Sequence, residues 1–366
     1  MLFDGYMPVR IVSGAGCLKN RGKDLSRFGS SCLIVCSGTA AGKSGALDDC
    51  IEVLEQQGIA YDVFDEITEN PRTATVHDAG RLARSVNASF IVGIGGGSPM
   101  DAAKAVAIYA ANPEMTPDGI YARPIPCMAL PVVLIGTTAG TGSEVTGVSV
   151  LTNLSGRKKS ISGPDCYAAL SFCDYRYSVT APPHITFSTA LDAFAHAVES
   201  ILCSTSNMRS TLYAEQAIRL LRPYILAVEA ENHPLTDEMY EALYAASIFA
   251  GLAINITGTA FPHTVGYYLT ENYHVPHGLA CAVFLPCLLE KAKKYCPEKC
   301  GAIEKQLGIS SEVLSAKLRN AINLGISIPT EEAQDAAQRW KDGVANFNRS
   351  PGGFTYIDAA DALADF

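Results

Sequence analysis

The amino-acid sequence predicts two domains: an α/β domain with a mainly parallel sheet, followed by an all-helical domain. In the first half of the chain, short β-rich runs alternate with helical runs, which is the pattern of βαβ units. In the second half, long helical runs follow one another. With 366 residues, of which 48% are hydrophobic, the chain is long enough to build two cores.

The expected strands and helices of the first domain alternate from residue 32 onward. The strands are predicted at 32–36, 60–65, 89–95 and 131–136, and the intervening helices at 44–58, 73–87 and 98–110. Apolar runs such as "PVVLIG" are typical of parallel strands that are buried on both faces. We therefore expect a Rossmann-like sheet covered by helices on both sides.

Two consecutive prolines, Pro182 and Pro183, mark the expected domain boundary. We expect residues 1–182 to form a dinucleotide-binding domain and residues 183–366 a helical, metal-binding domain. The helical runs of the second domain lie at 190–203, 211–230, 237–254 and 311–325, and the tail contains a turn and a short final helix.

Charge and composition argue for small-molecule chemistry. The net charge is −9 and there is no block of Lys or Arg, so we expect neither nucleic acid nor an anionic membrane as a partner. We recognise no signal peptide and no apolar window of about 18 residues, so a cytoplasmic protein is expected. The twelve cysteines are scattered through apparent strands and helices, as buried thiols usually are.

Residues 93–101, "GIGGGSPMD", join an apolar strand to a helix. Gly95, Gly96 and Gly97 carry no β-carbon, so a ligand could approach the backbone closely. The helix offers free N–H groups to a phosphate, and Ser98 is placed to cap it. The pattern predicts a phosphate site, although a tight turn without a ligand is the alternative, and the standard G-x-G-x-x-G fingerprint is missing.

A second loop, "GTTAGTGSEVT" at 136–146, also follows a strand. Its hydroxyl and backbone N–H groups could hold a ribose, a pyrophosphate or a nicotinamide amide. An ordinary polar loop would have the same composition, and the loop alone does not decide between the two.

The run "STALDAFAHAVES" places Asp192 and His196 four residues apart, so both side chains emerge on one face of a helix. A surface salt bridge is one explanation and a metal ion is another. Downstream lie His263 and His277, which bring the set to three imidazoles and one carboxylate. These donors suit Fe²⁺, Zn²⁺, Co²⁺ or Ni²⁺. His274 lies close to His277 but is not expected to take part.

At this point the sequence resembles the iron-containing, group III alcohol dehydrogenases over nearly its whole length. The resemblance is carried by "ENPR" at 69–72, "GIGGGSPMDAAKA" at 93–105, "TTAGTGSEVT" at 137–146, "APPHITFSTALDAFAHAVES", and "PHTVGYYLTENYHVPHGLACAVFLP". It implies a dehydroquinate synthase-like architecture with an active site between the two domains.

The resemblance also implies the site residues. The metal ligands would be Asp192, His196, His263 and His277, and these four residues with Tyr267 would be the catalytic residues. The cofactor-binding residues would be Asn70, Gly95, Gly96, Gly97, Ser98, Asp101, Thr137, Thr138, Thr141, Thr146 and Lys158.

Two departures from the family pattern affect the expected chemistry. Many members have a second His where this chain has Tyr267, which can exchange a hydrogen bond but does not charge near neutral pH. Members often carry an Asp where Ser37 and Gly38 stand. A carboxylate there would repel a 2′-phosphate. Since this turn has neutral donors and Lys43 close by, we expect NADP(H) to be used at least as well as NAD(H), unless the turn is simply a flexible loop.

The expected function is that of a metal-dependent, NAD(P)-linked alcohol dehydrogenase or aldehyde reductase. We expect a small alcohol or aldehyde as substrate, Fe²⁺ as the metal with Zn²⁺ as the alternative, and a homodimer. A glycerol dehydrogenase-like polyol oxidoreductase is the nearest alternative. A lyase of the dehydroquinate synthase type would need Lys and Arg around the metal helices. A nucleotide-binding protein without catalysis, which would retain the fold, is the non-enzymatic alternative.

Overall fold

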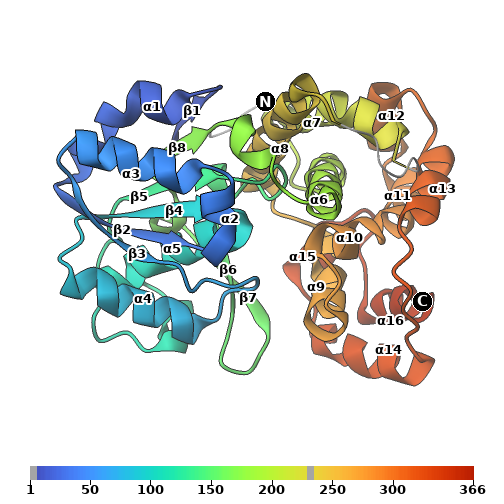
Figure 1. The fold of residues 1–366 in the computed structure, drawn as a ribbon. Coiled ribbons are helices and arrows are strands. Elements are labelled where there is room, and N and C mark those ends of the chain that lie inside the picture. Colours follow the sequence, from blue (N-terminus) through green and yellow to red (C-terminus); the bar gives the residue numbers. More distant parts are fainter. Residues whose placement is uncertain (1–5, 229–234) are drawn as a thin grey trace. The chain divides into compact units, whose positions relative to one another are not determined.

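The computed structural model describes residues 6–228 and 235–366, which belong to two compact units (Figure 1). The first unit comprises Met1–Pro182 and Thr236–Tyr244, and the second comprises Pro183–Leu235 and Ala245–Phe366. The split after Pro182 coincides with the expected boundary. Residues 236–244 were expected in the second domain but belong to the first unit. They contain the start of a long helix.

The first unit contains a six-stranded parallel sheet with the order β1-β8-β5-β4-β2-β3. Its strands are β1 (Arg10–Ser13), β2 (Ser31–Cys36), β3 (Ala60–Phe64), β4 (Phe90–Gly95), β5 (Val132–Gly136) and β8 (Leu170–Cys173). A separate antiparallel ribbon is made by β6 (Val148–Thr152) and β7 (Lys158–Ser162). The strands β1 and β8 and the ribbon are not among the strands predicted from the sequence, and each of these segments is only four or five residues long.

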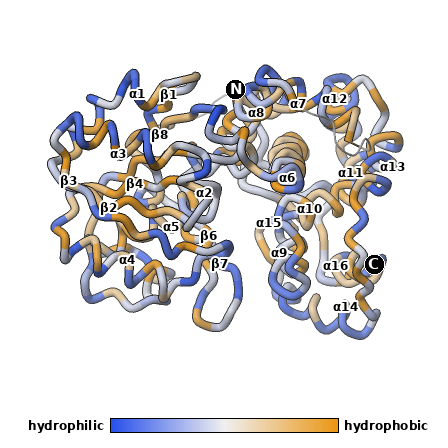
Figure 2. Tube along the Cα trace, viewed as in Figure 1, coloured by the Kyte–Doolittle hydropathy of each residue, from blue (hydrophilic) through white to orange (hydrophobic). Residues whose placement is uncertain are grey.

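Helices cover both faces of this sheet, as expected (Figure 1). They are α1 (Cys17–Arg21), α2 (Gly38–Lys43), α3 (Ala46–Gln56), α4 (Thr73–Ser85) and α5 (Gly97–Ala111). Successive side chains of β2 point to opposite faces: Leu33 joins the core under α4 and α5, whereas Ile34 joins the core under α1 and α3. Figure 2 shows the central strands as strongly hydrophobic, which is typical of a parallel sheet buried on both sides.

The register of the sheet places the ends of three strands side by side. Cys36 at the end of β2 pairs with Ile94 of β4, and Gly95 of β4 pairs with Gly136 of β5. The turns that follow β2, β4 and β5 therefore start at one edge of the sheet, the edge at which open α/β sheets bind their ligands.

The second unit is helical. Its helices are α6 (Pro183–Leu202), α7 (Met208–Leu226), the later part of α8 (Asp237–Thr257), α9 (Phe261–Tyr273), α10 (His277–Ala282), α11 (Leu285–Tyr295), α12 (Pro297–Leu307), α13 (Ser311–Ala321), α14 (Thr330–Ala337), α15 (Ala345–Arg349) and α16 (Tyr356–Ala364). Pro183 occupies the first turn of α6, where a missing N–H costs nothing.

By length and composition alone, α8 could cross a membrane, and it is the one such helix among the residues described. No such segment is expected from the sequence. Core helices pass the same test, and 44% of the apolar window of α8 is buried.

Candidate metal centre and nucleotide-binding loops

A stripe of polar side chains runs along the buried face of α6. Asp192, His196 and Glu199 follow one another at intervals of four and three residues, and their exposed fractions are 2%, 4% and 0%. Nε2 of His196 lies 3.7 Å from Oδ1 of Asp192. The stripe is buried among apolar residues, so the explanation of a salt bridge on a wet surface is wrong.

His263, in the first turn of α9, connects the two ends of this stripe. Its Nε2 lies 3.4 Å from Oδ1 of Asp192, and its Nδ1 lies 2.5 Å from Oε1 of Glu199. Oε2 of Glu199 accepts a hydrogen bond of 2.5 Å from the backbone N–H of Ala260. The carboxylate of Glu199 thus fixes the imidazole through Nδ1 and leaves Nε2 directed at Asp192.

The short helix α10 contributes His277 and Cys281. The ring of His263 stacks on that of His196 at 4.5 Å and meets that of His277 edge-on at 5.4 Å. One ligand atom from each of Asp192, His263, His277 and Cys281 lies within 4.8 Å of the others. The structure therefore brings three of the four predicted ligands into this group and adds a thiol. His196 is not part of the group, but it lies 3.7 Å from Asp192 and stacks on His263.

Glycine allows α10 to approach its neighbours this closely. A β-carbon at Gly278 would overlap the backbone carbonyl of Ser188 in α6, and one at Gly266 in α9 would lie 2.7 Å from the carbonyl oxygen of Ala280. Side chains at either position would push α10 away from α6 or α9 and separate His277 from the other donors.

Charges within the cluster shift the pKa values of its members. Burial opposes ionisation of Asp192, but the surrounding imidazoles outweigh it and lower the pKa of this carboxyl. Burial also works against a charged His263, yet Cys281 and Glu199 raise its pKa well above the usual range. Burial raises the pKa of the Cys281 thiol to about 11, so the metal-free protein keeps it protonated at neutral pH.

The donor set fits a divalent metal ion. Oδ1 of Asp192 and Nε2 of His263 are buried and make no hydrogen bond, which is rare for buried polar atoms. Two donors on a tetrahedral ion at about 2.1 Å are about 3.4 Å apart, and the distance from Asp192 to His263 is 3.4 Å. A carboxylate with neutral imidazoles leaves a divalent ion electrophilic and suits Fe²⁺, Co²⁺ or Zn²⁺.

Sequence reasoning missed Glu199 and Cys281. Glu199 extends the spacing of Asp192 and His196 by one further helical turn, and this signal was readable in "DAFAHAVE". Cys281 follows His277 by four residues and so shares its helix face, but nothing in the sequence separated it from the other buried cysteines.

Tyr267 stacks on His277, with ring centroids 5.5 Å apart and an interplanar angle of 18°. It therefore lies beside the cluster. His274 is exposed and adopts a left-handed conformation (φ 54°) at the end of α9, outside the group of candidate ligands.

The glycines of the turn after β4 allow its backbone to pack closely against the loop that follows β5. A β-carbon at Gly97 would lie 2.8 Å from Cγ2 of Thr141, and one at Gly96 would lie 3.1 Å from Oγ1 of Thr138. Gly95 has φ 148°, which other residues rarely adopt. The two predicted loops thus touch each other at the N-terminus of α5.

The expected cap of α5 is wrong. The helix begins one residue earlier than predicted, with Gly96 as the N-cap and no capping side chain. Ser98 lies inside the first turn, and its Oγ accepts a hydrogen bond of 3.3 Å from the backbone N–H of Asn70. The start of α5 therefore has no side-chain cap competing with a phosphate for its N–H groups.

Asn70 links this turn to the β6–β7 ribbon. It has a left-handed conformation (φ 56°), and its carbonyl accepts a hydrogen bond of 3.1 Å from Oγ1 of Thr152. Thr152 pairs with Lys158 across the ribbon. Asn70, Ser98 and Lys158, which are far apart in the sequence, are thereby connected at one end of α5.

Both carboxylate oxygens of Asp101 accept hydrogen bonds from other parts of the α/β unit. Its carboxylate accepts hydrogen bonds from Oγ of Ser143 (2.6 Å) and the N–H of Val150 (2.8 Å). The fully buried Lys104 donates to Ser143, to the carbonyl of Thr146 and to that of Val148. Together Asp101 and Lys104 hold the second loop in place. These contacts do not support a role of Asp101 in binding the cofactor, and that role stays a prediction.

The remaining predicted nucleotide residues lie in the turns that start at the same sheet edge. The N–H of Thr137 donates to the carbonyl of Gly95 (2.9 Å), and the buried Oγ1 of Thr138 makes no hydrogen bond. Ser37 directly follows β2, and the N–H of Gly38 donates to the carbonyl of Asp65 (2.9 Å).

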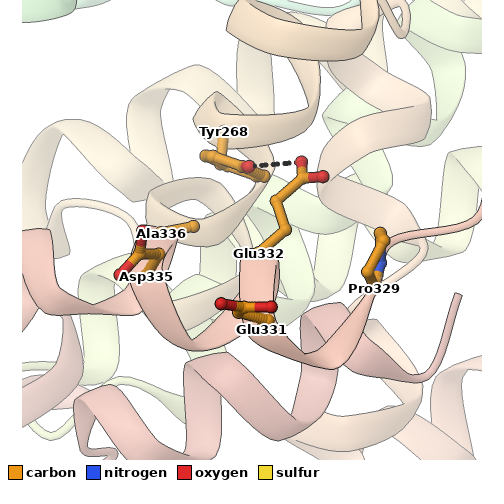
Figure 3. Close-up of a pocket in the computed structure, with 6 residues that line it drawn as sticks. All are labelled: Tyr268, Pro329, Glu331, Glu332, Asp335 and Ala336. Carbon is orange, nitrogen blue, oxygen red and sulfur yellow. Dashed lines mark hydrogen bonds between the residues drawn. The ribbon is translucent and has the colours of Figure 1, made fainter.

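A separate acidic pocket lies in the helical unit between α9 and α14 (Figure 3). It has a volume of about 520 Å³ and is lined by Tyr268, Pro329, Glu331, Glu332, Asp335 and Ala336. Glu332 accepts hydrogen bonds from the hydroxyl groups of Tyr268 (2.8 Å) and Tyr273. The carboxylate of Glu332 therefore already has hydrogen-bond partners. In this respect it differs from Oδ1 of Asp192 and Nε2 of His263 in the metal cluster, which have none.

An α/β unit with glycine-rich turns suited to a phosphate and a helical unit with a buried carboxylate–imidazole cluster are the features expected of a metal-dependent dehydrogenase linked to a nicotinamide nucleotide. The sequence profile of the iron-containing alcohol dehydrogenases matches residues 8–175, and the C-terminal profile of that family matches residues 186–327. The chain belongs to the iron-containing alcohol dehydrogenase family and is an oxidoreductase.

Individual relatives agree with this assignment. The chain is 32% identical to 1,3-propanediol dehydrogenase of Citrobacter freundii, with 86% of this chain and 81% of that protein aligned. It is 31% identical to long-chain-alcohol dehydrogenase 1 of Geobacillus thermodenitrificans, with 82% and 76% aligned. An iron-containing alcohol dehydrogenase from Thermotoga maritima has a similar crystal structure, with a TM-score of 0.91, 32% identity and coverage of 100% and 99%. These relatives support an alcohol dehydrogenase and do not favour the glycerol dehydrogenase-like, lyase or non-enzymatic alternatives.

Proposed function

We propose that Asp192, His196, His263 and His277 hold one divalent metal ion, at which a small alcohol or aldehyde reacts with NADP(H) or NAD(H). The observation that carries this proposal is the pair of buried atoms without a hydrogen bond, Oδ1 of Asp192 and Nε2 of His263, which lie 3.4 Å apart. Bound there, the metal supplies Lewis-acid activation of the alcohol or carbonyl oxygen, and the nicotinamide carries the hydride.

The residues of the chain orient and tune this site. Glu199 holds His263 with Nδ1 protonated, so that Nε2 is the nitrogen left for the ion. Asp192 is ionised throughout the physiological range because its pKa is lowered, and it supplies the one formal negative charge of the four ligands. Tyr267, stacked on His277, offers a hydroxyl that can donate or accept a hydrogen bond near the reacting oxygen.

The turns at the sheet edge would bind the nucleotide. The uncapped N-terminus of α5 is suited to the pyrophosphate, and Thr137, Thr138, Thr141 and Thr146 to the ribose and nicotinamide. Ser37 and Gly38 would lie at the adenosine ribose, where the lack of a carboxylate tolerates a 2′-phosphate. This arrangement favours NADP(H) at least as much as NAD(H).

The remaining assignments follow the relatives and the composition of the chain. Names such as 1,3-propanediol dehydrogenase and long-chain-alcohol dehydrogenase support alcohols and aldehydes as the substrate class. We assign Fe²⁺ as the preferred metal and Zn²⁺ as the alternative. We also infer a homodimer in the cytoplasm without nucleic-acid or membrane partners.

A metal titration combined with a substrate screen tests this function. The purified protein is stripped of metal and reloaded with Fe²⁺, Co²⁺ or Zn²⁺, and each form is assayed for aldehyde reduction with NADPH and with NADH. We expect one metal per chain and activity only in loaded forms. A protein that binds no metal at the cluster, or that reduces aldehydes equally well without it, would contradict the proposal.

A further inference from the structure

Cys281 adds a sulfur atom to the candidate ligand atoms of the metal cluster. It follows His277 by one turn of α10, so both side chains project from the same face of the helix. Its Sγ lies 3.7 Å from Nδ1 and 3.8 Å from Nε2 of His277. The residue is fully buried, as are its neighbours Asp192 and His263.

The distances are those of a mixed sulfur and nitrogen site. Zinc–sulfur bonds of about 2.3 Å and zinc–nitrogen bonds of about 2.1 Å place two ligand atoms of a tetrahedral ion roughly 3.6 Å apart. Cys281 and His277 are separated by about that distance. The sulfur also belongs to the group of four ligand atoms that lie within 4.8 Å of one another.

The surroundings of Cys281 differ from those of another buried cysteine of the helical unit. Cys203 has ordinary polar neighbours, because Oγ1 of Thr205 lies 3.1 Å and the carbonyl of Thr257 3.7 Å from its sulfur. The groups around Cys281 are those of the cluster itself. Two of them, Oδ1 of Asp192 and Nε2 of His263, are buried without a hydrogen bond and so independently indicate a cation-binding site.

We propose that Cys281 is a sulfur ligand of this metal centre and binds the ion as a thiolate. The inference rests on the proposed function, because it requires a metal at Asp192 and His263. On binding, the thiol passes its proton to water, since a thiol that coordinates a cation of this kind is deprotonated.

Thiolate coordination changes the character of the ion. A carboxylate alone leaves a divalent centre with a formal charge near +1, whereas a carboxylate and a thiolate bring it to zero. Thiolates are soft ligands and favour Zn²⁺ over oxygen-preferring cations. Compared with the same site without a thiolate, Cys281 should therefore raise the affinity for Zn²⁺ relative to that for Fe²⁺.

Cobalt substitution provides the direct test. The full-length protein is loaded with Co²⁺, and two signals are recorded: the near-ultraviolet charge-transfer band of a cobalt thiolate, and the sulfur shell at about 2.3 Å in X-ray absorption. We expect both signals in the wild-type protein. Cys281→Ser should abolish the band, whereas Cys287→Ser, which changes a half-buried cysteine on α11, should retain it.

Competition between metals gives a second measurement. Relative to wild type, Cys281→Ser should lower the ratio of Zn²⁺ affinity to Fe²⁺ affinity by about tenfold or more, because even groups outside the ligand shell change metal affinity by about 10- to 100-fold. The X-ray absorption measurement uses the wild-type protein, so the test stands even if Cys281→Ser does not fold.

The outcomes separate this inference from the proposed function. A cobalt ion with nitrogen and oxygen neighbours only, or a band that persists in Cys281→Ser, would overturn the role of Cys281 and leave the dehydrogenase centre intact. A protein that binds no cobalt at all would overturn both.

Discussion

Oε1 of Glu199 and Nδ1 of His263 lie 2.5 Å apart in the core of the helical unit. The contact assigns one nitrogen of the imidazole to a carboxylate and presents the other to Asp192. Carboxylates that orient metal-binding imidazoles in this way also raise their basicity. The buried N–H of Ala260 donates to the second oxygen of Glu199, so the carboxylate is held from both sides.

Substitution of Glu199 should weaken metal binding without removing a ligand. A glutamine retains one acceptor but cannot serve both His263 and Ala260, so we expect Glu199→Gln to lose metal affinity by about 10- to 100-fold. Chelator competition measures this effect, and Glu298→Gln on the exposed surface of α12 is the control. Unchanged affinity in Glu199→Gln would mean that packing alone orients His263.

Loss of His263 or His277 should have a larger effect. We expect His263→Ala and His277→Ala to abolish metal retention and activity, because a direct ligand counts for more than its supporting groups. The structure also improves the control at His274: its left-handed backbone favours glycine, so His274→Gly is expected to be nearly silent. Metal loss in His274→Gly with retention in His277→Ala would show that the ligand assignment in this loop is wrong.

Substitution of Tyr267 distinguishes between two roles for this residue, stacking on His277 and donating a proton. If its role is to stack on His277, Tyr267→Phe should lower turnover by tenfold or less, the effect of about 0.5–1.5 kcal/mol for one neutral hydrogen bond. A steady-state comparison of kcat and KM settles the matter. A fall of several orders of magnitude in kcat with an unchanged KM would place Tyr267 on the proton path.

Nucleotide preference should depend on the turn after β2. We expect catalytic efficiency with NADPH to equal or exceed that with NADH, and an introduced carboxylate to reverse this order by repelling the 2′-phosphate. Ser37→Asp is a better test than Gly38→Asp, because Gly38 has φ 27° and a side chain there would be strained, whereas Ser37 is extended. A wild-type preference for NADH of about a hundredfold would contradict the inference drawn from this turn.

Glu144 should make the stability of the protein depend on pH. Burial raises its pKa from the ordinary 4.5, and Tyr244 donates a hydrogen bond to it at 2.8 Å. A raised pKa means that the folded state holds the proton more tightly. This contribution is complete below the unfolded pKa and is lost as the pH rises through the folded value.

We therefore expect the Tm of the wild type to fall more steeply than that of Glu144→Gln as the pH rises above 4.5, the ordinary pKa of the carboxyl. The exposed Glu298→Gln serves as the control and should keep the wild-type slope. Equal slopes for the wild type and Glu144→Gln would show that the carboxyl titrates in the same way in both states.

The sequence predicted the parts of the molecule that depend on periodicity. Alternating strands and helices located β2, β3, β4 and β5, and the i, i+4 spacing placed Asp192 and His196 on one helix face. Local patterns could not supply contacts between distant segments. The pairing of Glu199 with His263 joins residues 64 positions apart, and the hydrogen bond from Asn70 to Ser98 turned an expected cap into a link between loops.

The helix α8 begins in the first unit and ends in the second, so the hydroxyl that serves Glu144 is supplied from beyond Pro182. A fragment that stops at Pro182 would bury the carboxyl group of Glu144 without the hydrogen bond from Tyr244. Recombination between relatives meets the same constraint: a chimera joined at Pro182 inherits Glu144 from one parent and residue 244 from the other. Such hybrids should fold best when both parents have this pair or when residues 236–244 are exchanged together with the N-terminal half.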